Sequence, residues 1–291
     1  MSLLTSLKSM LSGGRVDVRS RFEVLREAIS GTMSEFYKAR DRQNGRIVGL
    51  KILDAAKTAV FESRFKGLKK PTEGEIAVSL VHPHVVTTYE HGLTTSGQQY
   101  LVMEFLDGPG MNSLIIGRDS LLAGRRIAFL RQTAEALEAV HKAGYIHRDM
   151  CPRNLVLDER CESLKLIDFG LTVPASPEFM QPGNRTGTPN YMAPEIAKRQ
   201  KTDQRLDIFA FGVTAYEILT FELPWERGPT DKVIMAHANR APTDIREHRP
   251  RINARLAKAV ASCLERDPAA RCSSISLFLK MIRDVKHEDG S

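Results

Sequence analysis

Two short segments in the middle of the chain place acidic and amide side chains close together in sequence. The first is His147-Arg148-Asp149-Met150-Cys151-Pro152-Arg153-Asn154, and the second, Asp168-Phe169-Gly170, begins fourteen residues after Asn154. An aspartate can orient a hydroxyl group and accept its proton, while an amide and a second carboxylate supply the oxygen ligands that Mg²⁺ prefers. Asp149, Asn154 and Asp168 at this spacing predict phosphoryl transfer from a metal-bound nucleotide.

The apolar pattern predicts strands in the first third of the chain. Residues 47–53 are apolar enough for a strand buried on much of both faces, and Gln43-Asn44-Gly45 before them is a strong signal for a hairpin turn. A charged stretch around residues 73–75 predicts a helix. Residues 100–106 predict a further strand, which Asp107-Gly108 closes at a point suited to a hinge between two lobes.

The remainder of the chain has the pattern of helices. Residues 127–141 keep the three- and four-residue spacing of an amphipathic helix, and residues 206–220 are apolar nearly all round, which predicts a buried helix. Further amphipathic helices are expected over residues 253–265 and 274–285. Strands followed by helices predict an α+β chain in two unequal lobes.

Residues 1–19 form an extension with its own pattern. Its apolar side chains share one helical face that ends at Gly13-Gly14: Leu3, Leu4, Leu7, Met10 and Leu11. We expect a short helix packed on the domain, or a frayed terminus. A helix on a membrane surface is the alternative, but Lys8 as its only basic residue gives little attraction to lipid.

Composition excludes several classes of protein. The chain is 42% hydrophobic and 26% charged, as in soluble globular proteins, and no apolar run approaches the roughly 18 residues that cross a bilayer. The net charge of +7 comes from scattered basic residues without interleaved aromatic side chains, so we expect no nucleic-acid binding. The absence of a signal-peptide pattern and of C-x-x-C spacing among the four cysteines indicates reduced thiols in a cytoplasmic protein.

The chemical motifs follow one another in a characteristic order. They are Val48-Gly49-Leu50-Lys51, Glu73, the two segments above, GTPNYMAPE at 187–195, Asp207 and Arg271. Together they resemble the protein kinase superfamily over roughly residues 20–286. The resemblance implies a two-lobed kinase fold: a small N-lobe with an antiparallel sheet and one helix (20–104), a hinge (105–108) and a larger, mainly helical C-lobe (109–286).

The resemblance gives Lys51 a role at the nucleotide. Its ammonium group is expected to bind the α- and β-phosphates of ATP and to be held by a carboxylate on the next helix. Glu73 is the preferred partner because it lies nine residues before His82-Pro83, as in the family, and Glu75 is the rival. The alternative for Lys51 is a lysine of an edge strand that extends into solvent.

The remaining roles follow in the same way. Asp149 is the expected catalytic base, or the residue that orients the acceptor hydroxyl, and Asn154 and Asp168 are the expected ligands of Mg²⁺, with Mn²⁺ as an alternative. The resemblance implies nucleotide contacts from Gly31, Phe36, Gly49, Lys51, Met103, Glu104, Leu106 and Val156.

Residues around the acceptor site also receive roles by resemblance. His147 is expected to pack against Phe169 rather than to act as a general base. Arg148 is expected either to bind a phosphorylated residue or to make backbone contacts only. The candidate phosphorylation positions are Thr172, Ser176, Thr186 and Thr188.

Two further features concern the acceptor and the helical lobe. Thr188, two residues before Asn190-Tyr191, is expected near the catalytic aspartate, which favours serine and threonine over tyrosine as acceptors. Glu195 and Arg271 are expected to form a buried ion pair that attaches the activation segment to the helical lobe.

The chain departs from the family on the nucleotide side. In the phosphate loop at residues 29–36 only the middle glycine, Gly31, is present, although glycine lets the backbone approach phosphate closely. Phe36 stands where valine is usual, and Gly49 where alanine is usual. These two positions share one face, so we expect the ring of Phe36 to fill the space left by Gly49; a ring in the adenine slot would block the nucleotide instead.

The third departure is Cys151, which replaces the usual lysine two residues after the catalytic aspartate. A neutral thiol cannot neutralise the γ-phosphate, and we expect Arg153 to supply part of this charge; the alternative is an Arg153 that faces solvent beside a slow site. Redox sensing by Cys151 is a further hypothesis, on the ground that neighbouring cations would lower its pKa.

These features favour an ATP- and Mg²⁺-dependent kinase that modifies serine or threonine in a protein substrate. The first alternative is a pseudokinase, a kinase fold that acts as a scaffold or allosteric regulator with weak catalysis or none. The second is a small-molecule kinase of related fold, which residues 187–195 disfavour. A regulatory protein partner is also consistent with the resemblance.

Overall fold

The computed structural model describes residues 14–30, 33–182 and 186–290. The chain divides into two compact units. Unit 1 extends to Ser79 and includes Thr87–Phe105, and unit 2 consists of Leu80–Val86 and the chain from Leu106 onward. The expected N-terminal helix and Gly31 of the phosphate loop lie outside the described residues.

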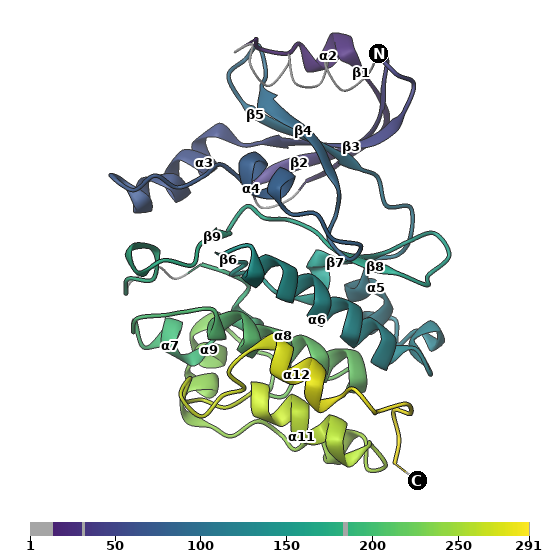
Figure 1. Cartoon of the computed structure of the whole chain (residues 1–291), viewed down its shortest axis with the longest axis vertical. Coiled ribbons are helices and arrows are strands. Elements are labelled where there is room, and N and C mark those ends of the chain that lie inside the picture. Colours follow the sequence, from purple (N-terminus) through teal and green to yellow (C-terminus); the bar gives the residue numbers. More distant parts are fainter. Residues whose placement is uncertain (1–13, 31–32, 183–185, 291) are drawn as a thin grey trace. The chain divides into compact units, whose positions relative to one another are not determined.

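The described part of unit 1 is built on an antiparallel sheet of five strands in the order β1-β2-β3-β5-β4 (Figure 1). The strands are β1 (Phe22–Ser30), β2 (Ser34–Asp41), β3 (Ile47–Leu53), β4 (Thr88–Leu93) and β5 (Gln99–Glu104). β2 and β3 form the predicted hairpin, in which Gly45 has a φ of 73° that favours glycine. β3 is buried over most of its length, as its apolar run predicts.

The chain that precedes the sheet packs on one of its faces. Val16 and Val18 pack against a cluster of buried side chains that consists of Phe22, Ala39, Val48, Leu50, Tyr100 and Val102. Val18 also begins the short helix α2 (Val18–Arg21). Because side chains alternate along a strand, Gly49 and Lys51 of β3 belong to the opposite face.

The described part of unit 1 has two further helices, α3 (Ala55–Glu62) and α4 (Glu73–Ser79), and thus more than the one helix expected. α4 begins with a capping box. The Thr72 N–H donates to Glu75 Oε2 at 2.7 Å, and the Glu75 N–H donates to Thr72 Oγ1 at 3.2 Å. This Thr-x-x-Glu pattern fixes the first turn of α4 and with it the backbone of Glu73.

Unit 2 is mainly helical (Figure 1). Its helices are α5 (Met111–Ile116), α6 (Arg126–Lys142), α7 (Pro194–Ala197), α8 (Arg205–Thr220), α9 (Thr230–Asn239), α10 (Ile245–His248), α11 (Ala254–Cys263) and α12 (Ile275–Met281). Two short antiparallel pairs join β6 (Tyr145–Ile146) to β9 (Val173–Pro174) and β7 (Leu155–Leu157) to β8 (Leu164–Leu166). Within the described ranges, no helix has the length and apolar character needed to cross a membrane.

The long helices agree closely with the apolar pattern, but α12 is shorter than expected. It ends at Met281 rather than at residue 285. The guanidinium group of Arg131 in α6 donates to the carbonyl oxygens of Ile282, Arg283 and Val285. These carbonyls therefore have a partner outside the helix, which explains why the last turn does not continue.

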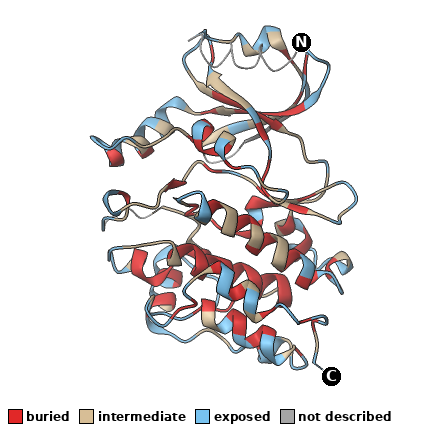
Figure 2. Cartoon of the chain, in the orientation of Figure 1, coloured by how far each residue is buried: buried red, intermediate tan, exposed pale blue. Residues whose placement is uncertain are grey.

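α8 packs against α6, α10 and α11 and is buried along almost its whole length (Figure 2). Gly212 allows the close approach of α11, because a Cβ at this position would lie 2.7 Å from Cβ of Cys263. Asp207 and Glu217 place two carboxylates inside this otherwise apolar helix, and both have polar partners in unit 2.

Candidate active site

Lys51 and Glu73 form a buried ion pair in unit 1. Lys51 Nζ lies 2.5 Å from Glu73 Oε1, and the two side chains are 8% and 7% exposed. A buried ammonium group is unfavourable unless it has a charged partner. The expected pairing is confirmed, and Glu75, the rival, uses its carboxylate in the capping box of α4.

The position of Glu73 also depends on the close approach of α4 to β4. A Cβ built on Gly74 would lie 2.4 Å from Cγ of His91, far inside van der Waals contact. Because glycine has only a hydrogen atom in place of a side chain, Gly74 allows α4 to pack closely against β4. The glycine next to the expected partner of Lys51 was not among the residues that the motifs indicated.

The ring of Phe36 fills the space beside Gly49. A Cβ at Gly49 would lie 2.7 Å from Phe36 Cζ and 3.1 Å from Met103 Cγ. The predicted compensation between the two substituted positions is confirmed. The ring of Phe36 also stacks on that of Phe105, with centroids 6.1 Å apart and planes at 13°.

The other residues expected to contact the nucleotide are divided between the two units. Met103 and Glu104 end β5 in unit 1, and Glu104 Oε1 accepts the Thr87 N–H at 2.6 Å. Leu106 begins the second part of unit 2, and Val156 lies in β7. Their contact with a nucleotide stays a prediction.

In unit 2, two residues orient the carboxylate of Asp149 through hydrogen bonds. Thr188 donates its backbone N–H and its hydroxyl to Oδ1, at 2.9 and 2.7 Å. Asn154 donates its amide to Oδ2 at 3.1 Å and to the Asp149 carbonyl at 2.7 Å. The expected position of Thr188 near the aspartate is confirmed, and Asp149 has a defined orientation.

Asp207 of α8 holds the backbone just before Asp149. Its carboxylate accepts the N–H groups of His147 and Arg148 at 2.8 Å each, and His141 Nε2 lies 2.9 Å away. Burial by itself favours the neutral acid, but the hydrogen bond and charge of His141 and the backbone donors lower the pKa of Asp207 below its usual value. The charged carboxylate stabilises Arg148 at a φ of 70°, which is strained for a residue with a Cβ.

Asp168 follows β8 and also has a positive φ, 65°. Its Oδ1 accepts the Gly170 N–H at 3.1 Å, so the turn itself orients the carboxylate. Phe169 meets His147 edge to face, with ring centroids 5.5 Å apart. His147 is fully buried and its Nδ1 accepts the Asp149 N–H at 3.3 Å, which agrees with a packing and hydrogen-bonding role.

Cys151 is buried and its thiol is not activated. Burial, together with the charge of Asp149, raises the pKa of Cys151 to about 11. The hypothesis that nearby cations lower this pKa for redox sensing is wrong, because burial outweighs the effect of Arg153. The guanidinium group of Arg153 is exposed and donates to Thr188 Oγ1 at 2.8 Å. Because the same hydroxyl donates to Asp149, a positive charge does lie close to the carboxylate of Asp149.

Two of the candidate phosphorylation positions have hydroxyl groups that already donate hydrogen bonds. Thr172 is fully buried and its hydroxyl lies 3.4 Å from the His147 carbonyl, while the Thr188 hydroxyl is bound to Asp149. Ser176 is partly exposed, whereas the hydroxyl oxygen of Thr186 is buried although the residue as a whole is partly exposed. Phosphorylation of this segment and its recognition by Arg148 stay predictions.

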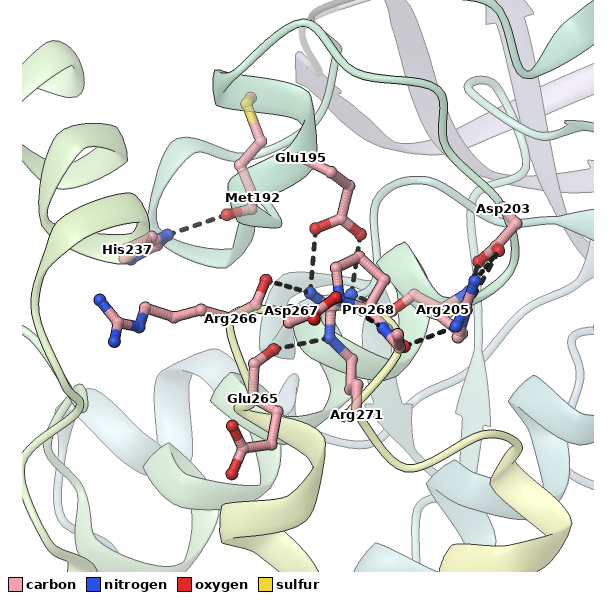
Figure 3. A network of polar contacts seen from close by, with 11 residues as sticks. Met192, Glu195, Asp203, Arg205, His237, Glu265, Arg266, Asp267, Pro268 and Arg271 are labelled. Carbon is pink, nitrogen blue, oxygen red and sulfur yellow. Dashed lines mark hydrogen bonds and ion pairs between the residues drawn. The ribbon is translucent and has the colours of Figure 1, made fainter.

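Glu195 and Arg271 form the expected buried ion pair (Figure 3). Arg271 Nη1 and Nη2 donate to the two Glu195 oxygens at 2.8 and 2.9 Å, and the side chains are 0% and 3% exposed. The same guanidinium donates to the carbonyls of Glu265 and Arg205. It therefore joins α7, the start of α8 and the loop that precedes α12.

Glu217 is a buried carboxylate that the motifs did not indicate. Tyr191 donates its hydroxyl to Oε2 at 2.5 Å, and Arg227 donates to Oε1 at 2.9 Å. Burial raises the pKa of Glu217, against the opposing effect of these two partners. The available signal was a carboxylate in a mostly apolar helix, which needs a partner when it is buried. Tyr191 ends the turn Pro189–Tyr191, so the cluster helps to fix the segment after Thr188.

Comparison with known proteins agrees with this fold and these residues. The model of the protein kinase domain matches residues 22–284. Serine/threonine-protein kinase pkn2 of Myxococcus xanthus is 33% identical over 276 residues, which cover 91% of this chain and 32% of that protein. Serine/threonine-protein kinase PknD of Mycobacterium tuberculosis is 32% identical over 257 residues, 87% of this chain and 38% of that protein. The chain spans about a third of the length of these relatives.

A sheet with a paired lysine and glutamate, together with a helical unit that orients Asp149, defines a protein kinase fold. The chain belongs to the protein kinase domain family.

Proposed function

We propose that this domain transfers the γ-phosphate of ATP to serine and threonine hydroxyl groups of protein substrates. The observation that supports this most directly is the carboxylate of Asp149, which Thr188 and Asn154 orient together. Acceptance of a hydroxyl proton requires such a fixed carboxylate. The relatives named serine/threonine-protein kinases support this class of acceptor.

The residues present fit a hard divalent cation. The amide nitrogen of Asn154 is bound to Asp149, so the amide oxygen is its remaining acceptor, and Asp168 supplies a carboxylate. We propose that these two residues hold Mg²⁺, whose other ligands are water and phosphate oxygens. The ion would neutralise phosphate charge, while Lys51, fixed by Glu73, would bind the α- and β-phosphates.

Other members of the family usually have a lysine at the position of Cys151, and Arg153 takes over the role of that lysine in this chain. The thiol of Cys151 is neutral at pH 7 because its pKa is about 11. The Arg153 guanidinium lies at the Thr188 hydroxyl and so supplies a positive charge beside Asp149. We propose that it stabilises the negative charge of the transferred phosphoryl group.

Replacing Arg153 with glutamine is expected to lower the rate of phosphate transfer by about 10²-fold, because one charge contact is lost. The affinity for MgATP should change much less. Arg160, another exposed arginine of unit 2, provides the matched control, and Arg160→Gln should transfer phosphate normally. A normal rate for Arg153→Gln would show that Arg153 only faces solvent.

Replacing Gly74 with alanine is expected to displace α4 from β4 and to separate Glu73 from Lys51. Overpacking of this kind costs about 1–3 kcal/mol of stability, and loss of the ion pair should lower phosphate transfer by about 10²-fold. Thermal unfolding and the rate would be measured for Gly74→Ala and for Gly74→Ala/His91→Gly, in which removal of the whole side chain makes room, because Cβ of His91 also lies only 2.5 Å from the added carbon. If the second change restores neither quantity, contact with His91 is not the cause.

The proposed function is tested with MgATP and a generic protein substrate. We expect incorporation of γ-phosphate on serine and threonine, its loss in EDTA, and an increase in the melting temperature with MgATP. An increase in melting temperature without transfer would favour the pseudokinase alternative, for which the neutral thiol of Cys151 is the supporting observation. No increase at millimolar MgATP would contradict the enzyme proposal.

We also propose a cytoplasmic location and, as the resemblance implies, a regulatory protein partner. The four cysteines are free thiols, which agrees with a reducing compartment. Measurement of the thiol content after isolation under non-reducing conditions tests the location, because four free thiols are expected.

A further inference from the structure

Two of the four cysteines lie next to each other at the ends of the loop that carries Arg271. Cys263 is the last residue of α11, and Cys272 lies three residues before α12. The side chains of the two cysteines form a hydrogen bond with each other. The Cys272 N–H also donates to the Ser262 carbonyl at 2.9 Å, and that carbonyl carbon is bonded to the nitrogen of Cys263. Disulfides join residues whose Cα atoms lie about 4.4–6.8 Å apart, and this backbone contact brings the two residues into such proximity.

The two thiols differ in access and in acidity. Cys263 is 0% exposed and Cys272 is 5% exposed, so an oxidant reaches Cys272 first. The hydrogen bond from Cys263 lowers the pKa of Cys272 against the opposing effect of burial, and the same bond together with burial raises the pKa of Cys263. While it is protonated, the Cys272 thiol donates to the Ser274 carbonyl at 3.3 Å. Cys272 is thus the better nucleophile, and Cys263 is the neighbour that can react with its oxidised form.

We propose that Cys263 and Cys272 are a modification site for peroxide, at which oxidation joins the two side chains in a disulfide. In the first step the Cys272 thiolate attacks one oxygen of hydrogen peroxide. An S–O bond forms, the O–O bond breaks, and hydroxide leaves with the electron pair and takes up the proton that Cys272 released. In the second step the Cys263 sulfur attacks the sulfenic acid, so that an S–S bond forms, the S–O bond breaks, and the departing hydroxide takes the Cys263 proton as water. The two thiols lose two electrons, and one peroxide becomes two waters.

The disulfide would close a ring of chain from Cys263 to Cys272 that contains Arg271. Figure 3 shows residues 265–268 of this loop beside Arg271, which is also bound to the buried carboxylate of Glu195. A disulfide stabilises a fold mainly by limiting the unfolded chain. We therefore expect the oxidised domain to keep the loop in place at higher temperature, with a melting temperature raised by about 5 °C. This inference does not depend on the function proposed above.

The test treats the folded domain with hydrogen peroxide, blocks the remaining thiols and digests the protein with trypsin in the absence of reductant. Trypsin cleaves after Arg266 and Arg271, so the ring opens and the disulfide is detected as residues 259–266 linked to residues 272–280. We expect this linked pair of peptides in the mass spectrum and its loss after treatment with dithiothreitol. The melting temperature should rise by about 5 °C with peroxide and return to its starting value with dithiothreitol.

Three variants assign the steps. Cys263→Ser leaves the oxidised Cys272 without a thiol to react with, so a dione reagent specific for sulfenic acid should label Cys272. Cys272→Ser should give neither the linked peptides nor a rise in melting temperature with peroxide. Cys161→Ser is the matched control, because Cys161 is a partly exposed cysteine elsewhere in unit 2. It should form the linked peptides and gain stability as the wild type does.

Recovery of the two peptides unlinked from the peroxide-treated wild type would overturn the inference without bearing on phosphate transfer. A link from Cys272 to Cys161, or one that forms only between two molecules, would also overturn the pairing. If the linked peptides form in the wild type but the melting temperature stays the same or falls, the disulfide does not secure the loop around Arg271, and the stabilising role is wrong.

Discussion

Replacing Asp149 with asparagine is expected to lower the rate of phosphate transfer by about 10³-fold, because general base catalysis typically contributes 10²- to 10⁴-fold. Asparagine has nearly the same shape, and its oxygen can still accept the hydrogen bonds of Thr188, although its amide nitrogen cannot accept the bond that Asn154 donates to Oδ2 of Asp149. It cannot accept the proton of the attacking hydroxyl. The rate would be measured with labelled ATP, beside the affinity for MgATP and the melting temperature, which should both stay near wild type.

Glu159 offers a matched control for the loss of one negative charge, since it is an exposed carboxylate of unit 2. Glu159→Gln should transfer phosphate at the wild-type rate. Equal incorporation by Asp149→Asn and the wild type would mean that the signal comes from a contaminating kinase, and the role proposed for Asp149 would have to be abandoned.

Replacing Arg271 with methionine is expected to lower the free energy of unfolding by about 3–5 kcal/mol, because it leaves the Glu195 carboxylate buried without its partner. The carbonyls of Glu265 and Arg205 lose a donor at the same time. A loss of this size lowers the melting temperature by about 10 °C in a domain of this length. Thermal unfolding followed by circular dichroism provides the measurement.

The double variant Glu195→Gln/Arg271→Met separates the buried charge from the lost packing. It removes the unpaired charge, so it should be more stable than Arg271→Met alone. If the double variant unfolds at the same temperature as the single variant, the cost does not arise from the charge of Glu195. The hydrogen bonds to the backbone carbonyls would then be the main contribution of Arg271.

The sequence predicted those features of the site that depend on local pattern. The spacing of Glu73 from His82-Pro83 indicated the partner of Lys51, and the Thr-x-x-Glu pattern at Thr72 could have excluded Glu75 as well. The fit between Phe36 and Gly49 was also predictable, because strand side chains alternate and the two substitutions change volume in opposite directions.

Features that depend on burial and on distant segments were not predictable in this way. The pKa of Cys151 was expected to fall because cations are its neighbours in sequence, but it rises because the folded chain removes the thiol from water. The contact of Arg153 with Thr188 joins residues 35 positions apart. The approach of Gly74 to His91 depends on how α4 lies on β4, which neither segment specifies alone.

α8 connects several parts of unit 2 to one another. Asp207 near its start binds the backbone before Asp149, Glu217 near its end binds Tyr191, and the carbonyl of Arg205 accepts from Arg271. Opening of this one helix would release all three contacts together. Slow amide hydrogen exchange in these segments should therefore show a single protection free energy, close to that of global unfolding. On heating, the catalytic geometry of unit 2 should disappear at the same temperature as its structure, without a partly active intermediate.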